Sequence, residues 1–345
     1  MRVGVLSRNE ILAIKQEGIH MRSGKSICGG LAAIGLALFA TAGFAQGYAA
    51  KAITFVYPYA PGSNADSSWR ILGQEVGRTL GQTVVHENRP GAGGRVGLDA
   101  LMRAPADGYT IGMFNNVLGV WQPLMDQKLA IEPVKDYTPV SLTIETPLVL
   151  TIRPGLPFRD LRGLIAYGKS NPGKLNGSSP GPGTGGHLAI ALLSSLAAIQ
   201  ITHVPYKGAA PSLTALLGGE SDLTFIDGAV KPHIDSGKAV GLMVGGNERW
   251  PLLPQVPTAP EAGLPAFRVS SWNGVVGPAG IPEEVREKLT RAFNDAANAP
   301  DVKAKLLASG WVIRAMTSQG MAQTIRADMD LFRPVIRDAN IKLDQ

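Results

Sequence analysis

Short runs of β-branched and aromatic residues alternate along this chain with longer stretches in which apolar residues recur every three or four positions. The short runs predict strands and the longer stretches predict amphipathic helices, and this alternation is typical of an α/β fold. The predicted strands are 53–57, 83–87, 110–114, 148–152, 201–204, 223–226, 239–244, 268–276 and 311–314. The predicted helices are 67–80, 95–104, 160–170, 187–196, 212–217, 282–298, 301–308 and 318–340, the last interrupted by Pro334.

Two segments predict where the chain passes between domains. Arg153-Pro154-Gly155-Leu156-Pro157 contains two prolines and a glycine, which stop helices and sheet ladders. The strand predicted at 268–276 then returns the chain to the first domain. We therefore expect residues 46–152 with 269–345 to form one domain and residues 153–268 a second, each with a sheet flanked by helices.

Two loops rich in glycine and proline each open a predicted helix. The first loop, 58–66, follows the strand 53–57, and the second loop, 178–187, precedes the helix 187–196. Proline fixes φ, glycine lets the backbone come close to a ligand, and the first N–H groups of a helix attract anions. We therefore expect the two loops to face each other across a cleft that binds an anion.

The candidate ligand-binding residues lie in these loops and at nearby strand ends. Asp66 is negative beside a predicted anion site, so it either caps its own helix or receives an ammonium or hydroxyl group of the ligand. His187 either donates to the ligand or braces its loop. Tyr206 either lines the cleft or is an ordinary half-buried tyrosine. Turn chemistry is the alternative role for Asn115 and Asp227. The full set is Tyr59, Pro61, Gly62, Ser63, Asn64, Asp66, Asn115, Ser179, Gly183, Thr184, His187, Tyr206 and Asp227.

The composition is that of a globular protein. With 345 residues, of which 45% are hydrophobic, the chain is long enough to bury substantial cores in about two domains. Glycine and proline are frequent, at 42 and 25 residues, but stay below the roughly 25–30% typical of low complexity, which indicates many loops. The proline-dense segment 250–260 is expected to pack on the surface as an extended arm.

The N-terminal residues predict export. Met21 is followed by basic residues, an uncharged apolar stretch and small residues up to Ala45, the pattern of a signal peptide, which we place at 1–45 with Met21 as an alternative start. An uncleaved membrane anchor is the alternative. Cys28, the only cysteine, lies within this segment. The mature chain would thus lack cysteine, which excludes disulfides and thiolate chemistry.

Charge and histidine spacing argue against two further functions, nucleic-acid binding and metal binding. The formal charge is +6, half of it in residues 1–45, and no basic run is interleaved with aromatic residues, so we expect no binding of nucleic acid. The remaining histidines, His86, His187, His203 and His233, lack the spacing of metal ligands, so we expect no metal.

A series of motifs in the same order resembles a known family. They are Pro61-Gly62 with Asp66 and Arg70, ENRPGAGG at 87–94, DGYT at 107–110, NPGKLN at 171–176, Gly183-Thr184 with His187, VPYKG at 204–208, and LLPQVPT at 252–258. Together they resemble the Bug proteins, the solute-binding components of tripartite tricarboxylate transporters. The resemblance spans essentially the whole mature chain.

The resemblance implies a periplasmic protein of the two-domain α/β periplasmic-binding-protein (Venus flytrap) architecture. Such a protein holds a small carboxylated solute through backbone groups and bridging waters, and delivers it to a membrane permease. We expect a monomer with no cofactor and no enzymatic activity. Ser63 stands where the family usually has glycine, and the second loop carries Pro180, Pro182, Gly185 and Gly186 in place of serine-rich sequence. The changes in the second loop remove hydroxyl donors, so we expect the ligand to differ from the better-known ones.

Two other functions fit parts of the sequence. Gly177-Ser178-Ser179-Pro180-Gly181 matches G-x-S-x-G, so a secreted α/β hydrolase using Ser179 is one alternative. Pro180 argues against it, because proline has no N–H to donate to an oxyanion. The match of 181–186 to G-x-G-x-x-G lacks the acidic residue that a dinucleotide site requires about 20 residues further on. A carboxylate sensor that feeds no permease is the other alternative.

Overall fold

The structure, a computed structural model, describes residues 48, 50–126, 129 and 131–342. The predicted signal peptide with Cys28 lies outside the described residues. The chain divides into two compact units, Met1–Ala50 and Lys51–Gln345, and the second unit carries the fold described below. None of the described helices has the length and apolar content needed to cross a bilayer.

The first sheet has six strands in the order β11-β4-β10-β3-β1-β2. Its strands are β1 (Ile53–Tyr57), β2 (Val84–Asn88), β3 (Thr110–Asn115), β4 (Tyr137–Pro147), β10 (Ser270–Pro278) and β11 (Val312–Ile313). β1 pairs in parallel with β2 and β3, whereas β10 and β11 pair antiparallel to their neighbours. The sheet is therefore mixed.

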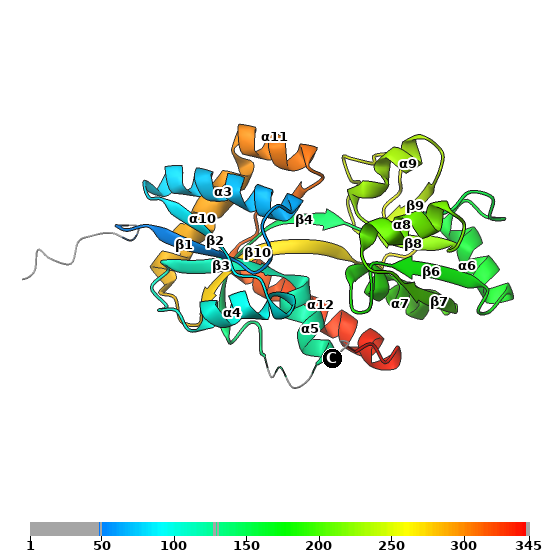
Figure 1. The fold of residues 1–345 in the computed structure, drawn as a ribbon, viewed down its shortest axis with the longest axis horizontal. Helices are drawn as coiled ribbons and strands as arrows, with labels where there is room; N and C mark the ends of the chain where they lie inside the picture. The colour runs from blue at the N-terminus through cyan, green and yellow to red at the C-terminus, as the bar shows by residue number, and fades with distance from the viewer. Residues whose placement is uncertain (1–47, 49, 127–128, 130, 343–345) are drawn as a thin grey trace, which may run out of the picture. The chain divides into compact units, whose positions relative to one another are not determined.

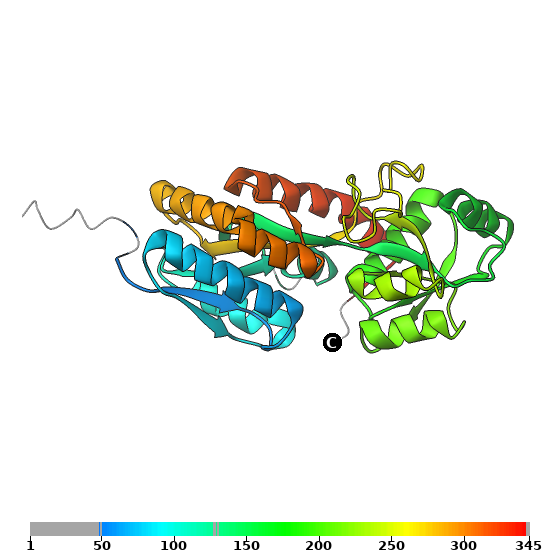
Figure 2. The same ribbon diagram turned by 90° about the horizontal axis from the view of Figure 1, so that it is seen from above.

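Helices cover both faces of this sheet (Figures 1 and 2). They are α3 (Asn64–Leu80), α4 (Arg95–Met102), α5 (Gln122–Met125), α10 (Glu283–Asn298), α11 (Pro300–Ala308) and α12 (Ser318–Asp338), with the short turns η2 (Ala92–Gly94) and η3 (Val117–Trp121). α3 and α10 lie side by side on one face, and α4 covers the other. The face between α3, α10 and β1 buries Phe55, Trp69 and Phe293, whose rings are in mutual contact.

The second sheet has five strands in the order β7-β6-β8-β5-β9. These are β5 (Val149–Ile152), β6 (Leu175–Ser179), β7 (Ile201–Pro205), β8 (Leu223–Ile226) and β9 (Val240–Val244). Around it lie α6 (Leu161–Ser170), α7 (Gly185–Ala197), α8 (Ala209–Leu217), η5 (Gly228–Val230) and α9 (Lys231–Asp235). β6 is parallel to β7 and β8, and β5 is antiparallel to β8 and β9.

The chain crosses between the sheets at two neighbouring points. β4 ends at Pro147 and β5 begins at Val149, while β10 enters the first sheet at Ser270, where it pairs with the end of β4 (Figure 1). α12 packs on β4 and also on α7, so it contacts elements of both sheets. The predicted strand 148–152 is present as β5 but lies in the second sheet, not the first. The exact division into two domains stays a prediction.

Most predicted elements are present, but two central strands were missed. β4 contains Pro139 and Pro147, which argue against a strand, and Pro139 is accommodated beside an irregularity in the β10 ladder. β6, with the sequence LNGSS, has low strand propensity. A Cβ at Gly177 would come within 2.9 Å of Ile190, so this glycine lets α7 pack closely on the strand.

Two local predictions need correction. Segment 250–260 was expected to be an extended surface arm, but it is a series of turns whose apolar side chains Trp250, Leu253 and Val256 are buried in a hydrophobic cluster. α12 runs to Asp338 without interruption at Pro334. Pro334 is exposed, so the carbonyl that loses its helical partner can bond water instead.

Candidate functional site

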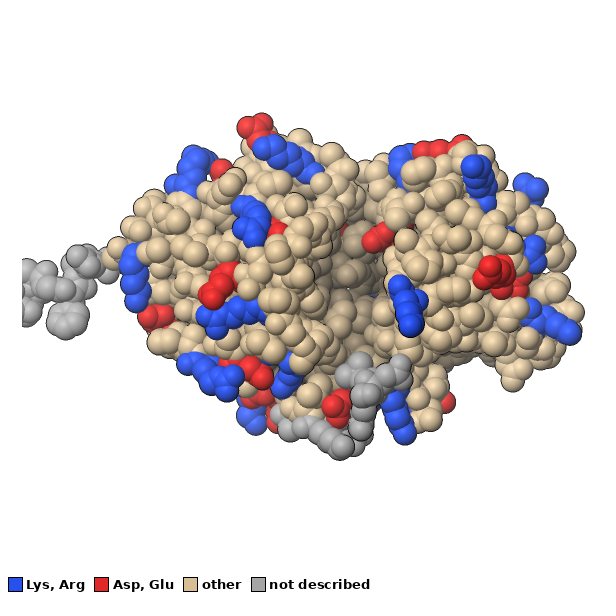
Figure 3. All heavy atoms as spheres, viewed as in Figure 1, with Lys and Arg blue, Asp and Glu red and all other residues tan. Residues whose placement is uncertain are grey.

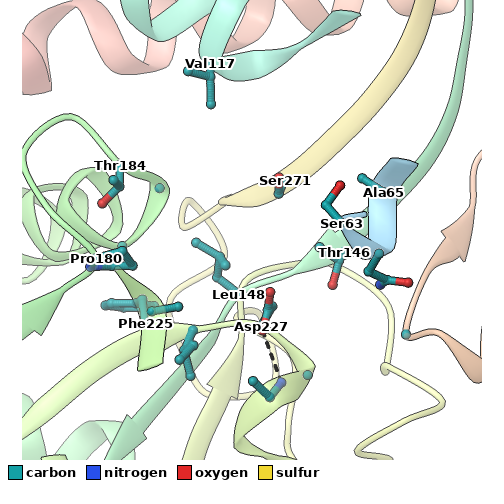
Figure 4. Close-up of a pocket in the computed structure, with 18 of the residues that line it drawn as sticks. Ser63, Ala65, Val117, Thr146, Leu148, Pro180, Thr184, Phe225, Asp227 and Ser271 are labelled. Atoms are coloured by element: carbon teal, nitrogen blue, oxygen red, sulfur yellow. Dashed lines mark hydrogen bonds between the residues drawn. The ribbon is translucent and has the colours of Figure 1, made fainter. Parts of the chain in front are cut away.

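A cleft of about 970 Å³ lies between the two sheets, beside the crossing of β4 and β10. Residues from both sheets line it: the start of α3, the η3–α5 segment, the two crossing strands, the second loop and the end of β8 (Figure 4). The space-filling view shows the hollow, with few Lys, Arg, Asp or Glu side chains on its walls (Figure 3). A cleft of this size is typical of small-molecule sites.

The second loop presents the start of α7 to the cleft. Thr184 is the N-cap residue, yet its hydroxyl donates to Gly181 O at 2.7 Å and provides no cap for the helix. Gly185 and Gly186, the first residues of α7, line the cleft with no side chain capping their N–H groups. Such unpaired N–H groups, at the positive end of the helix dipole, favour an anion.

The first loop is held by its own side chains. Ser63 Oγ accepts from Asp66 N at 3.0 Å and bonds to the Tyr57 hydroxyl at 2.9 Å, while Asp66 Oδ2 accepts from Gly62 N at 3.1 Å. This is a reciprocal cap of α3. Asn64 Nδ2 donates to Ser309 O at 3.1 Å, which links the loop to the segment after α11. Ser63 and Asn64 line the cleft in this fixed arrangement.

Asp66 is buried and does not line the cleft. Its carboxylate accepts from Gly62 N, Arg70 Nε, Asn88 Nδ2 and His86 Nε2, all within 3.1 Å. Burial raises the pKa of this carboxyl, but the hydrogen bonds from Asn88, Gly62 and Arg70 outweigh it and lower the pKa to about 2. Of the two roles predicted for Asp66, the structure thus has the helix cap.

This buried carboxylate should make folding stability depend on pH. Because the pKa of Asp66 in the folded protein lies below its ordinary value of 3.8, ionised Asp66 stabilises the fold above about pH 4, and this contribution is lost as the pH falls toward 2. The shift corresponds to about 2 kcal/mol. Urea unfolding should therefore show a stability gap between wild type and Asp66→Asn at pH 6 that narrows at pH 3.

The control for this experiment is Asp295→Asn, because Asp295 is exposed on α10. Its stability should follow that of wild type over the same pH range. A gap between wild type and Asp66→Asn that is equal at pH 6 and pH 3 would contradict the assignment.

Ser179, His187 and His203 lie behind the second loop, outside the cleft lining. Ser179 is fully buried, and its hydroxyl bonds to His203 Nε2 at 2.6 Å. The rings of His187 and His203 stack at 3.7 Å, and Gly183 N donates to His187 Nδ1 at 3.1 Å. Burial lowers the pKa of His187, and burial together with the nearby His187 lowers the pKa of His203 to about 4. His187 therefore braces its loop, and Ser179 is not exposed as a hydrolase nucleophile must be.

Tyr59, Asn115 and Tyr206 also lie outside the cleft lining. Asn115 Nδ2 donates to the Tyr59 hydroxyl at 3.1 Å, and Asn115 Oδ1 accepts from Leu118 N at 3.0 Å, so this pair fixes the turn after β3. The Tyr206 hydroxyl donates to Glu220 at 3.0 Å. Asp227 does line the cleft, and it caps η5 by accepting from Ala229 N at 3.1 Å (Figure 4).

The predicted site residues thus fall into two groups. Ser63, Asn64, Gly183, Thr184 and Asp227 line the cleft. Tyr59, Pro61, Gly62, Asp66, Asn115, Ser179, His187 and Tyr206 are absent from its lining. Direct ligand contact by the first group stays a prediction.

Several cleft residues were missed by sequence reasoning. Val117, Trp121 and Met125 form part of the wall, and the paired residues Thr146 and Ser271 lie where β4 and β10 cross. The indole N–H of Trp121 has no acceptor among the described residues. The apolar residues resemble an ordinary core segment in sequence. Their position directly after a strand end, where α/β proteins bind ligands, was the available signal.

In the part of the chain that the structure describes, no group of three or more His, Cys, Asp or Glu side chains is placed to hold a metal ion.

Comparison with known proteins gives consistent matches. Residues 69–341 match the family described as "Tripartite tricarboxylate transporter family receptor". The chain is 33% identical to Protein BugT of Bordetella pertussis, over 91% of this chain and 98% of that protein. It is 32% identical to MatC of Rhodopseudomonas palustris, solved with bound malate, with a TM-score of 0.66 over 83% of this chain and 99% of that one. A further R. palustris structure, with adipate, is 29% identical with a TM-score of 0.69 over 86% and 99% of the two chains.

These matches cover nearly all of the compact unit that contains the cleft. The family is one of solute-binding receptors and not of enzymes, which excludes the hydrolase alternative. The chain belongs to the tripartite tricarboxylate transporter family receptors, the TctC-like or Bug solute-binding proteins.

Proposed function

We propose that this protein captures a small carboxylated solute in the cleft between its two sheets and delivers it, in the periplasm, to the permease subunits of a tripartite tricarboxylate transporter. The observation that carries the proposal is the uncapped start of α7 in the cleft wall. An ionised carboxylate there accepts from the N–H groups of Gly185 and Gly186 and interacts favourably with the helix dipole.

The local backbone supports close approach of such a ligand. Gly183 has φ of +69° and Gly181 has φ of +142°, and neither carries a side chain between the loop and the cleft. On the opposite side, Ser63 and Asn64 belong to the first loop. A carboxylate between these loops would bring the two sheets together by bending at the crossings, the hinge closure common among binding proteins.

The relatives support the chemical class that we propose for the ligand and its delivery to a transporter. MatC was solved with malate and its R. palustris relative with adipate, and both ligands are small carboxylic acids. The family is named for receptors of tricarboxylate transporters. The signal peptide predicted at 1–45 would bring the protein to the periplasm, where we propose that it acts as a monomer.

The proposal is tested by identifying the ligand that the protein retains during purification. Mature protein purified without denaturation should release a small carboxylic acid that mass spectrometry detects after unfolding. A sample unfolded, dialysed and refolded beforehand is the control and should release none. A sugar or lipid without an acid group as the released molecule would contradict the proposal.

A further inference from the structure

A second pocket, of about 280 Å³, lies on the other face of the β4–β10 pair from the cleft. In this ladder Thr146 is opposite Ser271, and both line the cleft. On the next rung Glu145 is opposite Trp272, and both line the second pocket, which we call the rear pocket. Because successive side chains of a strand point to opposite faces, the ladder itself separates the two spaces, and they share none of the described lining residues.

Helix α12 forms another wall of the rear pocket. Thr324, Asp328 and Phe332 line it, and their spacing of four residues places them on one face of the helix. Asp328 Oδ2 accepts from Trp272 Nε1 at 2.7 Å, while Asp328 Oδ1 has no hydrogen-bond partner among the described residues. The rear pocket thus contains a carboxylate with an unused acceptor.

A second unused acceptor belongs to Asn116, which is 1% exposed and lines the same pocket. Asn116 Nδ2 donates to Ser270 O at 2.6 Å, which fixes the orientation of the amide. Asn116 Oδ1 then has no donor within the described chain. A buried acceptor without a donor costs free energy, so its presence beside a pocket indicates a bound molecule that donates to it.

The charges around Asp328 leave it without a cation. The guanidinium of Arg314 is paired with Glu145 and Glu248. Arg268 is exposed and forms no ion pair with the described residues. Burial, with Glu145 adding to it, raises the pKa of Asp328 to about 6 in spite of Arg268. The Asp328 carboxylate is therefore ionised at neutral pH but poorly compensated.

We propose that the rear pocket is a binding site for a small organic ammonium ion. The N–H groups of this ion donate to the Asp328 carboxylate and to Asn116 Oδ1, and its charge compensates the unpaired carboxylate. Val269, Trp272 and Phe332 give the pocket apolar wall for an alkyl chain, which favours an amine over an inorganic cation. The site is separate from the cleft, and the proposal does not depend on the function proposed for the cleft.

Calorimetric titration of the mature protein with butylammonium chloride at pH 7.5 tests the site, with sodium chloride at equal concentration as the blank. We expect one saturable site. Butyltrimethylammonium keeps the charge but has no N–H to donate, so it should bind about tenfold more weakly. At pH 5 the affinity for butylammonium should fall about tenfold, because Asp328, with a pKa of about 6, is then mostly protonated while the amine keeps its charge.

A near-isosteric variant locates the site. Asp328→Asn removes the charge and keeps an acceptor for the indole of Trp272, so the variant should fold and should bind butylammonium at least about tenfold more weakly. Asp330→Asn is the matched control, because Asp330 is exposed on the same helix and lies outside the rear pocket. It should bind butylammonium as the wild type does.

The outcomes are separate from those for the proposed function, which is tested by the released acid. Saturable binding that depends on N–H groups, on pH and on Asp328 supports the rear pocket as an ammonium site. No saturable binding, or binding that Asp328→Asn leaves unchanged, overturns it. Loss of binding in Asp227→Asn instead would place the amine in the cleft and would also overturn it. The comparisons of the two ammonium ions and of the two pH values use the wild type, so they decide the question even if Asp328→Asn does not fold.

Discussion

Replacing Gly183 with valine is expected to abolish carboxylate binding while leaving a folded protein. Gly183 lies in the cleft wall with φ of +69°, a conformation that a β-branched residue adopts only at a cost of about 1–3 kcal/mol. The side chain would also obstruct the approach of a ligand to the start of α7. Relief of the strain would move the N–H that donates to His187, and with it the loop.

The measurement is thermal unfolding with and without ligand. A ligand at about 100 times its Kd adds about 2.7 kcal/mol to the stability of the wild type, and the melting temperature rises by several degrees. Gly183→Val should show no such rise. Gly237→Val is the matched control, because Gly237 has φ of +70° in open space and lies outside the cleft. It should lose comparable stability and keep the full ligand-induced rise.

A folded Gly183→Val protein that binds a carboxylate as tightly as the wild type would refute the site between the two loops. The ligand would then bind elsewhere in the molecule.

Arg314→Met is expected to destabilise the fold by about 3 kcal/mol, because it leaves a buried carboxylate without its cation. Arg314 follows β11, and its guanidinium pairs with Glu145 on β4 and, at 3.0 Å, with Glu248 after β9. Glu145 is only 9% exposed and also accepts from Ser270 Oγ at 3.3 Å. The network therefore lies at the crossing between the sheets, where we propose that the protein bends on closure.

Urea unfolding at pH 7 measures this effect. Glu248→Gln is the control, because the Glu248 side chain is 70% exposed and its ion pair should contribute no more than about 1 kcal/mol. The double variant Arg314→Met with Glu145→Gln should recover part of the loss, since it also removes the unpaired charge. A loss below about 1 kcal/mol for Arg314→Met alone would contradict the role of this pair.

Features written in a few consecutive residues were predictable from the sequence. The run Ile53–Tyr57 forms β1 over the range expected, and the serine, glycine and aspartate of the first loop cap α3. The second loop does open α7, although the helix begins two residues earlier than predicted, at Gly185. These predictions succeeded because strand propensity, helix capping and positive φ at glycine depend mainly on neighbours along the chain.

Two interior strands, β4 in the first sheet and β6 in the second, were not predictable in this way. β4 includes two prolines and β6 reads LNGSS, so local propensity argues against both. Each is stabilised by ladders to strands distant in sequence, β4 to β10 and β6 to β7 and β8. Tertiary pairing thus overrides local preference at the positions that set the geometry of the cleft.

The sequence by itself determined that two glycine-rich loops precede helices and that Ser63, Asn64, Gly183, Thr184 and Asp227 were candidates for the cleft. Only the tertiary structure decided that Asp66, Ser179 and His187 turn away from it as supports, and that the apolar segment from Val117 to Met125 forms its wall. Residue type specifies which bonds a side chain can form. Which side of a loop faces the ligand depends on where the two sheets cross, and that is decided by contacts between residues far apart in the chain.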